Sequence, residues 1–338
     1  MSPVFESVAA FEQALHQLRT VDAAACADAA ARQDVLTKPR GSLGRLEDIA
    51  VFLAGWQGRA RPRLDHGRVA IFAGNHGVAA RGVSAYPVEV TAQMVANFQA
   101  GGAAINALAG AAGLELMVVP IELDRPTADF VDAPAMSVEE CLAALNLGAA
   151  VVAPDLDLLV LGEMGIGNST AAAALSAASF GGSARDWVGP GTGVHGSALD
   201  AKLAAVEGAL ERHRIATTSA FELLRRLGGR EIAAIAGAVL ATRQAGVPVL
   251  LDGFICSSAV APLAMERPEI TEHCLAGHCS AEPGHARLLE RLGLAPILSL
   301  GMRLGEGSGA AVAAGVVRAA LAAHDQMASF AEAGVAEA

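Results

Sequence analysis

The chain has 338 residues, 53% hydrophobic and 17% charged, enough to bury the core of one large domain or of one domain with a smaller satellite. Its formal net charge of −11 argues against partners such as nucleic acid or an anionic membrane surface. Five scattered cysteines fit reduced thiols in the cytoplasm better than a disulfide framework. We expect no signal peptide and no transmembrane helix, because no apolar run reaches the roughly 18 residues of a membrane span without a polar break.

Helical periodicity dominates the first part of the chain. Apolar positions recur at helical spacing over residues 4–18, 23–36 and 43–56. The turn between the last two segments carries three basic residues, Lys38, Arg40 and Arg45. They could meet an anion, but a solvated turn is the favoured interpretation. Residues 59–62 then look like a linker.

Beyond the linker, short apolar runs alternate with helical stretches. The runs predict five strands, at residues 69–73, 116–120, 156–161, 247–251 and 296–300. This alternation predicts a parallel α/β sheet with right-handed crossovers. Four of the five strands end in a loop of glycines and polar residues. Ligands bind at the carboxyl ends of the strands in open parallel sheets, so these loops are the candidate site.

The loop after the last predicted strand carries one carboxylate, Glu306, among three glycines. The glycines permit positive φ and let backbone amides approach a ligand. Ser308 stands where an N-cap is expected, ahead of helix-forming residues 310–323. The turn taken alone fits either a ligand site or an ordinary loop with a solvated glutamate.

Two other loops are rich in glycine. Residues 162–168 resemble a dinucleotide fingerprint in the wrong order and lack a P-loop lysine, although their amides and the following helix could hold a phosphate or a ribose. Residues 188–193 form a glycine-rich turn that precedes a lone basic residue, Lys202. Turn amides with one point cation make a phosphate cradle. A tight turn followed by a surface lysine is the equal alternative.

A group of soft ligands near residue 280 raises the question of zinc. It consists of His273, Cys274, His278, Cys279 and His285. No second pair completes a known zinc frame, and neighbouring donors tend to point in different directions around a helix or turn. We therefore predict no metal site, and the hydroxyl of Ser280 with its nearby amides matters more.

Two further residues follow the first strand. His76 could act as a general base, but a structural histidine that bonds the loop backbone is favoured. Tyr86, the only tyrosine, could wall an aromatic pocket or simply pack in the fold. The chain has no G-x-S-x-G elbow, which leaves serine-hydrolase chemistry without support.

Taken together, the motifs resemble one family. In chain order they read LTKPRGSLGRLE, GNHGV followed by EVT, GEMGIGNST, VGPGTG with Lys202, PVLLDGF, HCSAE and MRLGEGSGAA. As a set they resemble the nicotinate-nucleotide–dimethylbenzimidazole phosphoribosyltransferases of cobalamin lower-ligand assembly, from about residue 36 to 314. The resemblance implies transfer of phosphoribose from nicotinate mononucleotide to 5,6-dimethylbenzimidazole or a related base, giving α-ribazole 5′-phosphate and nicotinate.

The resemblance also implies an architecture. We expect a homodimer whose large domain, residues 67–309, is a doubly wound, mostly parallel α/β sheet. A small helical domain is expected from both chain ends, residues 1–66 and 310–338. The chemistry asks for no cofactor.

The motif matches assign residues to roles. Glu306 is the expected general base, and Glu163 is expected beside the reacting centre. The mononucleotide and its phosphate are assigned to Gly165, Gly189, Gly191, Thr192, Gly193, Lys202, Ser280 and Gly305. The base is assigned to Tyr86, Met94, Met164 and Leu304. Some relatives present a serine and a glutamine where this chain has Tyr86 and Met94.

The reaction makes use of such groups. Nicotinate leaves from a pyridinium-type N-glycoside without protonation, whereas the attacking azole carries an N–H that a positioned base can remove. A carboxylate also stabilises an oxocarbenium-like centre, and an anchored phosphate positions the sugar. A non-catalytic nucleotide-binding protein on the same fold is the competing hypothesis. A dehydrogenase is disfavoured by the glycine order and the missing ribose-binding acid.

Overall fold

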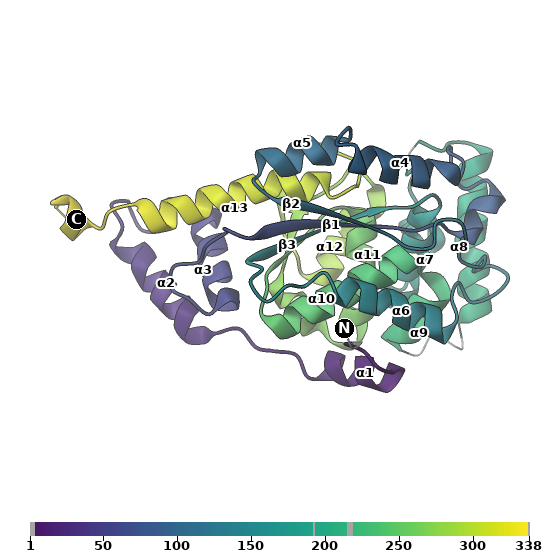
Figure 1. Cartoon of the computed structure of the whole chain (residues 1–338), viewed down its shortest axis with the longest axis horizontal. Coiled ribbons are helices and arrows are strands. Elements are labelled where there is room, and N and C mark those ends of the chain that lie inside the picture. The colour runs from purple at the N-terminus through teal and green to yellow at the C-terminus, as the bar shows by residue number, and fades with distance from the viewer. Residues whose placement is uncertain (1–3, 192, 215–218, 337–338) are drawn as a thin grey trace.

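The computed structural model describes residues 4–191, 193–214 and 219–336. Its centre is one parallel sheet of six strands in the order β2-β1-β3-β4-β5-β6 (Figure 1). The strands are β1 (Gly67–Ala73), β2 (Glu115–Pro120), β3 (Leu158–Met164), β4 (Val249–Leu251), β5 (Cys274–His278) and β6 (Pro296–Leu298).

Helices cover both faces of this sheet. The α-helices are α1 (Val8–His16), α2 (Ala23–Val35), α3 (Arg45–Gln57), α4 (Glu89–Gln99), α5 (Ala104–Ala111), α6 (Val138–Ala149), α7 (Asn168–Phe180), α8 (Ser197–His213), α9 (Ala220–Leu227), α10 (Arg230–Ala245), α11 (Phe254–Glu266), α12 (Pro283–Leu292), α13 (Ser308–Gln326) and α14 (Phe330–Ala333). Short 3-10 helices are η1 (Gly77–Arg81), η2 (Ala184–Asp186) and η3 (Pro268–His273). No helix in the described ranges is both long and apolar enough to cross a membrane.

Alternate residues of the strands enter two separate cores. Val69 and Ile71 pack with α3, α4, α5 and α13 on one face. Ala70 and Phe72 pack on the other face with helices that include α6, α7, α10 and α11. Successive strand side chains point to opposite faces, so a strand buried on both sides is apolar throughout. This explains why the apolar run at residues 69–73 predicted a strand correctly.

The strand order fixes where a ligand can bind. β1 lies between β2 and β3, so the chain builds the sheet first to one side of β1 and then to the other. The loops after β1 and β3 therefore begin beside each other at the same edge of the sheet, at a topological switch point. The predicted doubly wound α/β class is confirmed.

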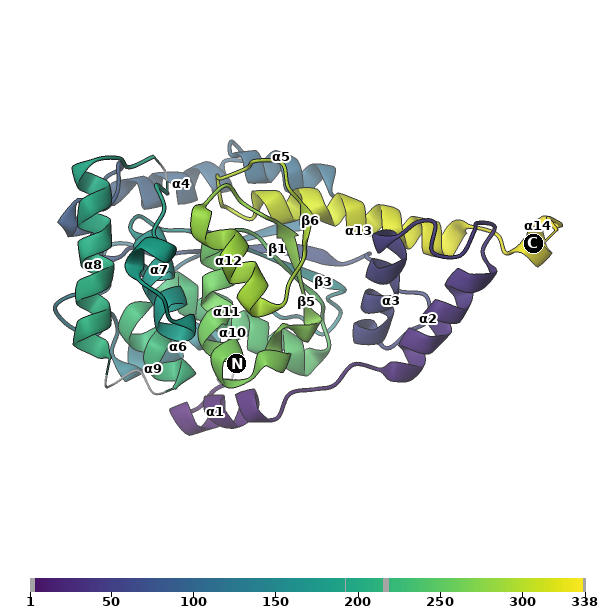
Figure 2. The same cartoon turned by 180° about the vertical axis from the view of Figure 1, so that it is seen from behind.

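Segments from the two parts of the chain near its ends meet beyond one edge of the large body, where α2 and α3 lie beside the far half of α13 (Figures 1 and 2). The Arg32 guanidinium donates to the carbonyls of His324 and Asp325 at 2.7 and 2.9 Å. By contrast, α1 lies on the large body, where the Phe11 and Phe221 ring centroids are 6.1 Å apart. The first turns of α13 pack on the sheet, so this helix links both regions.

Two details of the predicted elements are wrong. The strand β5 was missed, because its histidines and glycine look unlike a buried strand although the sheet encloses it on both sides. The strand β6 ends at Leu298 and is half-buried, not buried, because it lies at the edge of the sheet. Leu300, expected inside that strand, is 61% exposed.

Candidate active site

A cavity lies at the carboxyl ends of β3, β4, β5 and β6. Four segments line it, with one residue of each taken here as a marker: Glu163 in the last residues of β3, Phe254 after β4, Ser280 after β5 and Glu306 before α13. Gly191, from the turn before α8, completes the lining. Because the strands are parallel, their last residues share one edge of the sheet, and this brings together motifs that are far apart in sequence.

Glu306 occupies an unusual backbone position. It is 6% exposed and has a φ of 63°, a region that non-glycine residues seldom adopt. The Asp252 carboxylate, from the loop after β4, accepts the amides of Gly307 at 3.1 Å and Ala310 at 2.9 Å. Asp252 thus caps α13 from a neighbouring strand and fixes the residues next to Glu306.

The expected N-cap role of Ser308 is wrong. Ser308 is the first residue of α13, and its hydroxyl donates to the Gly305 carbonyl at 2.6 Å. The residue at the N-cap position is Gly307, which has no side chain to cap with. The acceptor that a local serine would have supplied comes instead from Asp252.

Glu163 lies directly against the loop that carries Glu306. A Cβ at Gly305 would lie 2.6 Å from Glu163 Oε1, so only glycine leaves room for this carboxylate. The Asn168 side-chain amide donates to Glu163 Oε2. The carboxylate is buried, and its loop opens α7. The two glutamates expected at the reacting centre therefore line one cavity from adjacent loops.

The surroundings of both glutamates favour their neutral forms. Burial raises the pKa of Glu163 to about 8, and the charges of Asp252 and Glu231 add to this shift. Burial also raises the pKa of Glu306 to about 7, with Asp252 again adding to it. Near neutral pH, Glu163 holds its proton while Glu306 titrates, and a group that titrates there suits general-base catalysis.

The glycine-rich turn and Lys202 come together as one cradle. The Lys202 ammonium is 1% exposed and donates to Ser169 Oγ and the Gly189 carbonyl, each at 2.9 Å. The surface-lysine alternative is therefore wrong. Burial lowers the pKa of Lys202 to about 8. A Cβ at Gly191, where φ is 55°, would lie 3.0 Å from Ser169 Oγ and 3.2 Å from Lys202 Nζ.

Only some of the other residues assigned to the mononucleotide and its phosphate line the cavity. Gly165 and Gly191 line the cavity, and Gly189 joins it through the Lys202 contact. Gly193 lies on the same turn but is not among the lining residues. Thr192 falls outside the described residues.

Ser280 lines the cavity with a fixed hydrogen-bond partner behind it. The Ser280 amide donates to His285 Nδ1 at 2.9 Å, and the hydroxyl lies at the same distance from that nitrogen. Nδ1 must therefore be an acceptor, so Nε2 carries the proton and donates to Ser257 Oγ at 3.1 Å. Burial lowers the pKa of His285 to about 3, so the ring is neutral and holds Ser280 in place.

The histidines and cysteines near residue 280 do not converge. His273 bonds the Ile270 and Val239 carbonyls on the far side of β5, whereas His285 bonds two serines. Within the described ranges, no three His, Cys, Asp or Glu side chains are grouped to hold a metal ion.

His76 was expected to bond the backbone of its loop, and the structure shows a different partner. Its Nε2 lies 2.5 Å from Glu231 Oε1 of α10, and both side chains are fully buried. It therefore bonds a carboxylate and not the loop backbone. A Cβ at Gly165 would lie 3.2 Å from the same Glu231 oxygen, so the pair packs against the loop that follows Glu163.

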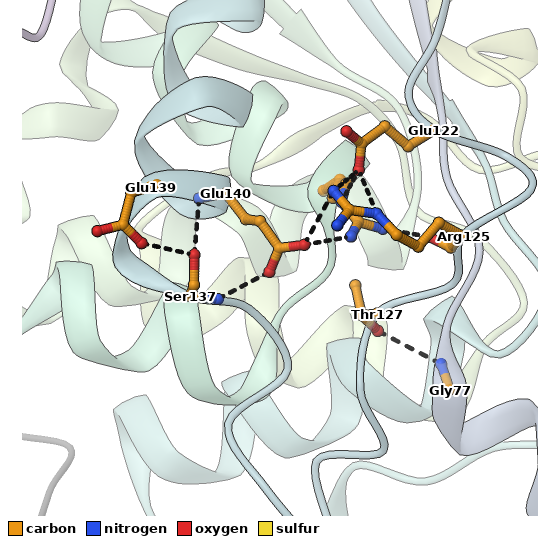
Figure 3. A network of polar contacts seen from close by, with 8 residues as sticks. Gly77, Glu122, Arg125, Thr127, Ser137, Glu139 and Glu140 are labelled. Carbon is orange, nitrogen blue, oxygen red and sulfur yellow. Dashed lines mark hydrogen bonds and ion pairs between the residues drawn. The ribbon is translucent and has the colours of Figure 1, made fainter.

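The loop after β1 is held from the side of β2. Figure 3 shows Thr127, whose hydroxyl accepts the Gly77 amide at 3.3 Å. Nearby, the Arg125 guanidinium lies between Glu122, which follows β2, and Glu140 of α6, at 3.3 Å from the latter. The Thr127 contact ties the β2 loop to the loop of His76, and the Arg125 contacts tie it to α6.

The four residues expected to bind the base are divided by the structure. Met164 and Leu304 line the cavity. Tyr86 is 51% exposed and is not among the lining residues. Met94 is half-buried and packs into the core between α13 and the sheet. Base binding by Tyr86 and Met94 stays a prediction.

Several lining residues had no role in the sequence interpretation. They are Asn168, Ser169, His278, Glu282 and Arg303. Asp252, which caps α13 but does not line the cavity, belongs with them. All six lie inside the quoted motifs, GEMGIGNST, PVLLDGF, HCSAE and MRLGEGSGAA. Each lies close in sequence to a residue with an assigned role, and this closeness was the signal that could have identified them.

The same chain matches known proteins along nearly its whole length. A family model described as a phosphoribosyltransferase matches residues 18–335. A nicotinate-nucleotide–dimethylbenzimidazole phosphoribosyltransferase from Novosphingobium aromaticivorans is 67% identical over 333 residues, 98% of each chain. One of the same name from Mesorhizobium japonicum is 60% identical over 308 residues, 91% of this chain and 92% of the relative.

A solved structure agrees with these matches. The crystal structure of the phosphoribosyltransferase of that name from Thermus thermophilus has a TM-score of 0.87 and 42% identity, and the match covers 94% of this chain and 100% of that one. The fold and the family model define the chain as a phosphoribosyltransferase. More narrowly, it belongs to the nicotinate-nucleotide–dimethylbenzimidazole phosphoribosyltransferase family, as its motifs suggested.

Proposed function

We propose that this enzyme transfers phosphoribose from nicotinate mononucleotide to 5,6-dimethylbenzimidazole or a related base. The products are nicotinate and α-ribazole 5′-phosphate, for the lower ligand of cobalamin. One observation carries the proposal: a single cavity is lined by Glu163 and Glu306 and also by Gly191, which lies against Lys202. A proton acceptor and a phosphate anchor are the two groups that this transfer needs.

The roles follow from the surroundings of each group. Glu306, with a pKa near neutrality, takes the azole N–H proton as the azole nitrogen attacks C1′. Its charge also stabilises the oxocarbenium-like sugar until that moment. Glu163 stays protonated beside it and avoids a second buried negative charge. Nicotinate leaves as the C1′–N bond breaks, and its ring takes the bonding pair without a proton.

The glycine turn and Lys202 serve the far part of the substrate. Lys202 is held by Ser169 and Gly189, so its position is set before any ligand arrives. A buried ammonium and turn amides suit a phosphate monoester. Binding of the phosphate supplies free energy that holds C1′ in position for attack. This positioning lowers the barrier of the chemical step. Ser280 and Gly305 are proposed to line the mononucleotide pocket.

A product assay tests the reaction. We expect nicotinate and the corresponding α-nucleotide by chromatography when purified protein receives nicotinate mononucleotide with each member of a panel of benzimidazole, purine and phenolic acceptors. Omitting the acceptor is the control. A non-catalytic nucleotide-binding protein would bind the mononucleotide without releasing nicotinate, and this outcome would overturn the proposal.

Three further features belong to the proposal. We expect a homodimer in the cytoplasm, as the family resemblance and the five free cysteines support. Residues 1–66 with 310–338 are proposed as a small helical domain and residues 67–309 as the large domain, with α1 reaching across to the large body. Light scattering in solution tests the dimer.

A further inference from the structure

Glu282 is a carboxylate in the cavity that the proposed reaction leaves without a role. It stands just before α12 and is 8% exposed. It lines the same cavity as Ser280 and Arg303. Among the described residues, its Oε2 atom has no hydrogen-bond partner. A buried carboxylate oxygen without a partner is costly, so its retention calls for a reason other than stability.

The Glu282 carboxylate lies in the glycine turn itself. The Gly191 backbone acts on this carboxylate and lowers the pKa of Glu282. A Cβ at Gly189 would lie 2.1 Å from its Oε2, so the turn has room for the carboxylate only because residue 189 is glycine. The positive charges of Lys202, from α8, and of Arg303, from the loop before α13, act on the carboxyl of Glu282 and lower its pKa. Arg303 lines the same cavity. These groups are the ones that a bound phosphate would use.

We propose that Glu282 is a built-in competitor of the substrate phosphate, which binds well only when this carboxylate moves aside or takes up a proton. The inference rests on the proposed function, because it takes the turn and Lys202 as the phosphate site. It makes Glu282 a residue that sets substrate affinity, not one that touches the reacting atoms.

The electrostatics of the cradle support this role. Two anions in one buried site repel each other, and the repulsion costs binding energy unless one of them is neutralised. Burial is the largest influence on Glu282 and raises its pKa, although Lys202, Gly191 and Arg303 oppose the shift. The carboxylate is therefore easier to protonate than an exposed one. Once protonated from solvent, it can donate a hydrogen bond to a phosphate oxygen.

The test compares the binding of two ligands to the whole protein. Isothermal titration at pH 7 measures the dissociation constant of nicotinate mononucleotide and of nicotinate riboside, which lacks the phosphate. Lys202, with a pKa of about 8, keeps its proton at this pH. For Glu282→Gln we expect the mononucleotide to bind about tenfold more tightly, since one repelling charge is gone. The riboside should be unaffected.

A matched control and a second variant complete the design. Glu290→Gln removes an exposed carboxylate from the same helix, α12, and should change neither affinity. Glu282→Asp withdraws the carboxylate from the turn and should give a smaller gain. The wild type should bind the mononucleotide more weakly than Glu282→Gln does at pH 7.5. This difference in affinity should shrink as pH falls to 5.5, because protonation of Glu282 removes the competing charge. The titration of the ligand itself is common to both proteins.

Unchanged or weaker binding of the mononucleotide to Glu282→Gln would overturn the inference. Weaker binding would instead show that the carboxylate accepts hydrogen bonds from the substrate, for instance from ribose hydroxyls. Equal tightening of the riboside would also overturn it, because the effect would not concern the phosphate. The proposed reaction fails separately, when a wild type that binds the mononucleotide releases no nicotinate.

Discussion

The two parts of the cavity hold opposite charges in different surroundings, with acidic groups around Glu306 and a buried cation at Lys202. Around Glu306, acidic groups crowd together, and Asp252 raises the pKa of both Glu163 and Glu306. Around Lys202, a buried cation donates to two neutral oxygens, and burial lowers its pKa although the charge of Glu282 opposes the shift. In both parts, the surroundings disfavour the charged form of the central residue. Glu306 is therefore ready to accept the proton of the azole, and Lys202 is ready to accept the negative charge of the phosphate.

This difference teaches how the two parts should respond to mutation. The acidic part acts on the proton and the transition state, so its loss should appear in turnover. The Lys202 cradle acts on the ground state and the position of the sugar, so its loss should appear in the use of the mononucleotide. The predictions below would sharpen or break this division, and they run from the largest expected effect to the smallest.

Glu306→Gln should have the largest effect. Glutamine keeps the size of the side chain but cannot take a proton or carry a charge. We expect kcat to fall by roughly 10²–10⁴, the usual contribution of general-base catalysis, with little change in substrate binding. In the wild type, the pKa of about 7 predicts that the rate falls as pH drops below neutrality and protonates the base. Steady-state kinetics across pH should show that this limb is missing in the variant.

Glu163→Gln is the matched control for that experiment, because it changes the adjacent carboxylate. At pH 7, Glu163 already holds its proton, with a pKa of about 8, so glutamine should be tolerated better there than at Glu306. Near-normal turnover of Glu306→Gln combined with an inactive Glu163→Gln would assign the base to Glu163 instead.

Lys202→Ala should have the second-largest effect, and it should lower kcat/KM for the mononucleotide. A hydrogen bond to a charged group contributes roughly 1.5–3 kcal/mol, or about ten- to a hundred-fold in kcat/KM for nicotinate mononucleotide. The KM of the azole should change little. An unchanged kcat/KM for the mononucleotide would remove Lys202 from the phosphate site and break the proposed division.

Much of this picture was present in the sequence. The apolar run at residues 69–73 predicted β1, because a strand covered on both faces is apolar at every position. The motifs also led to Glu163 and Glu306, since glycines surround both. Glu306 lies in a loop as expected, whereas Glu163, expected in the loop after residues 156–161, is the last residue but one of β3. Local patterns of this kind carry both the element and the position of a side chain at its end.

The rest depended on contacts between distant segments. The strand β5 was hidden because the neighbouring strands that bury its histidines are not visible in its own residues. The capping of α13 by Asp252 joins residues 55 or more positions apart, and it requires α13 to pack back across β5 and β4 so that its first turn reaches the β4 loop. The burial of Lys202 likewise depends on α8 packing against α7, which carries Ser169.

Asp252→Asn should have a smaller effect on rate and a clear effect on the pH profile. Asparagine has the same shape, but it carries no charge and can accept for only one of the two capped amides. Because the charge of Asp252 raises the pKa of Glu306, its removal should lower that pKa and move the acidic limb of the kcat profile to lower pH. Losing part of a helix cap should cost about 1 kcal/mol of stability, measured by urea unfolding.

An acidic limb that stays in place would show that burial alone sets the pKa of Glu306. Asp252→Ala separates the two contributions, because it removes both the charge and the cap. A shift in the asparagine variant that alanine reproduces, with a further loss of stability, would assign the pH effect to charge and the stability effect to the cap.

Removal of divalent metal should have no effect on turnover. His285 accepts from Ser280 and donates to Ser257, and His278, which lines the cavity, lies 3.5 Å from Asp252 Oδ1. Among the described residues, no three His, Cys, Asp or Glu side chains are grouped to hold a metal ion. In the proposed transfer, the leaving nicotinate ring takes the bonding electrons without help, and Lys202 supplies the positive charge for the phosphate. We therefore expect the same kcat before and after prolonged dialysis against a chelator, measured by nicotinate release. A loss of turnover that zinc restores would show that the Glu306 region needs a cation to manage its crowded negative charge, and the contrast between the two parts of the cavity would no longer hold.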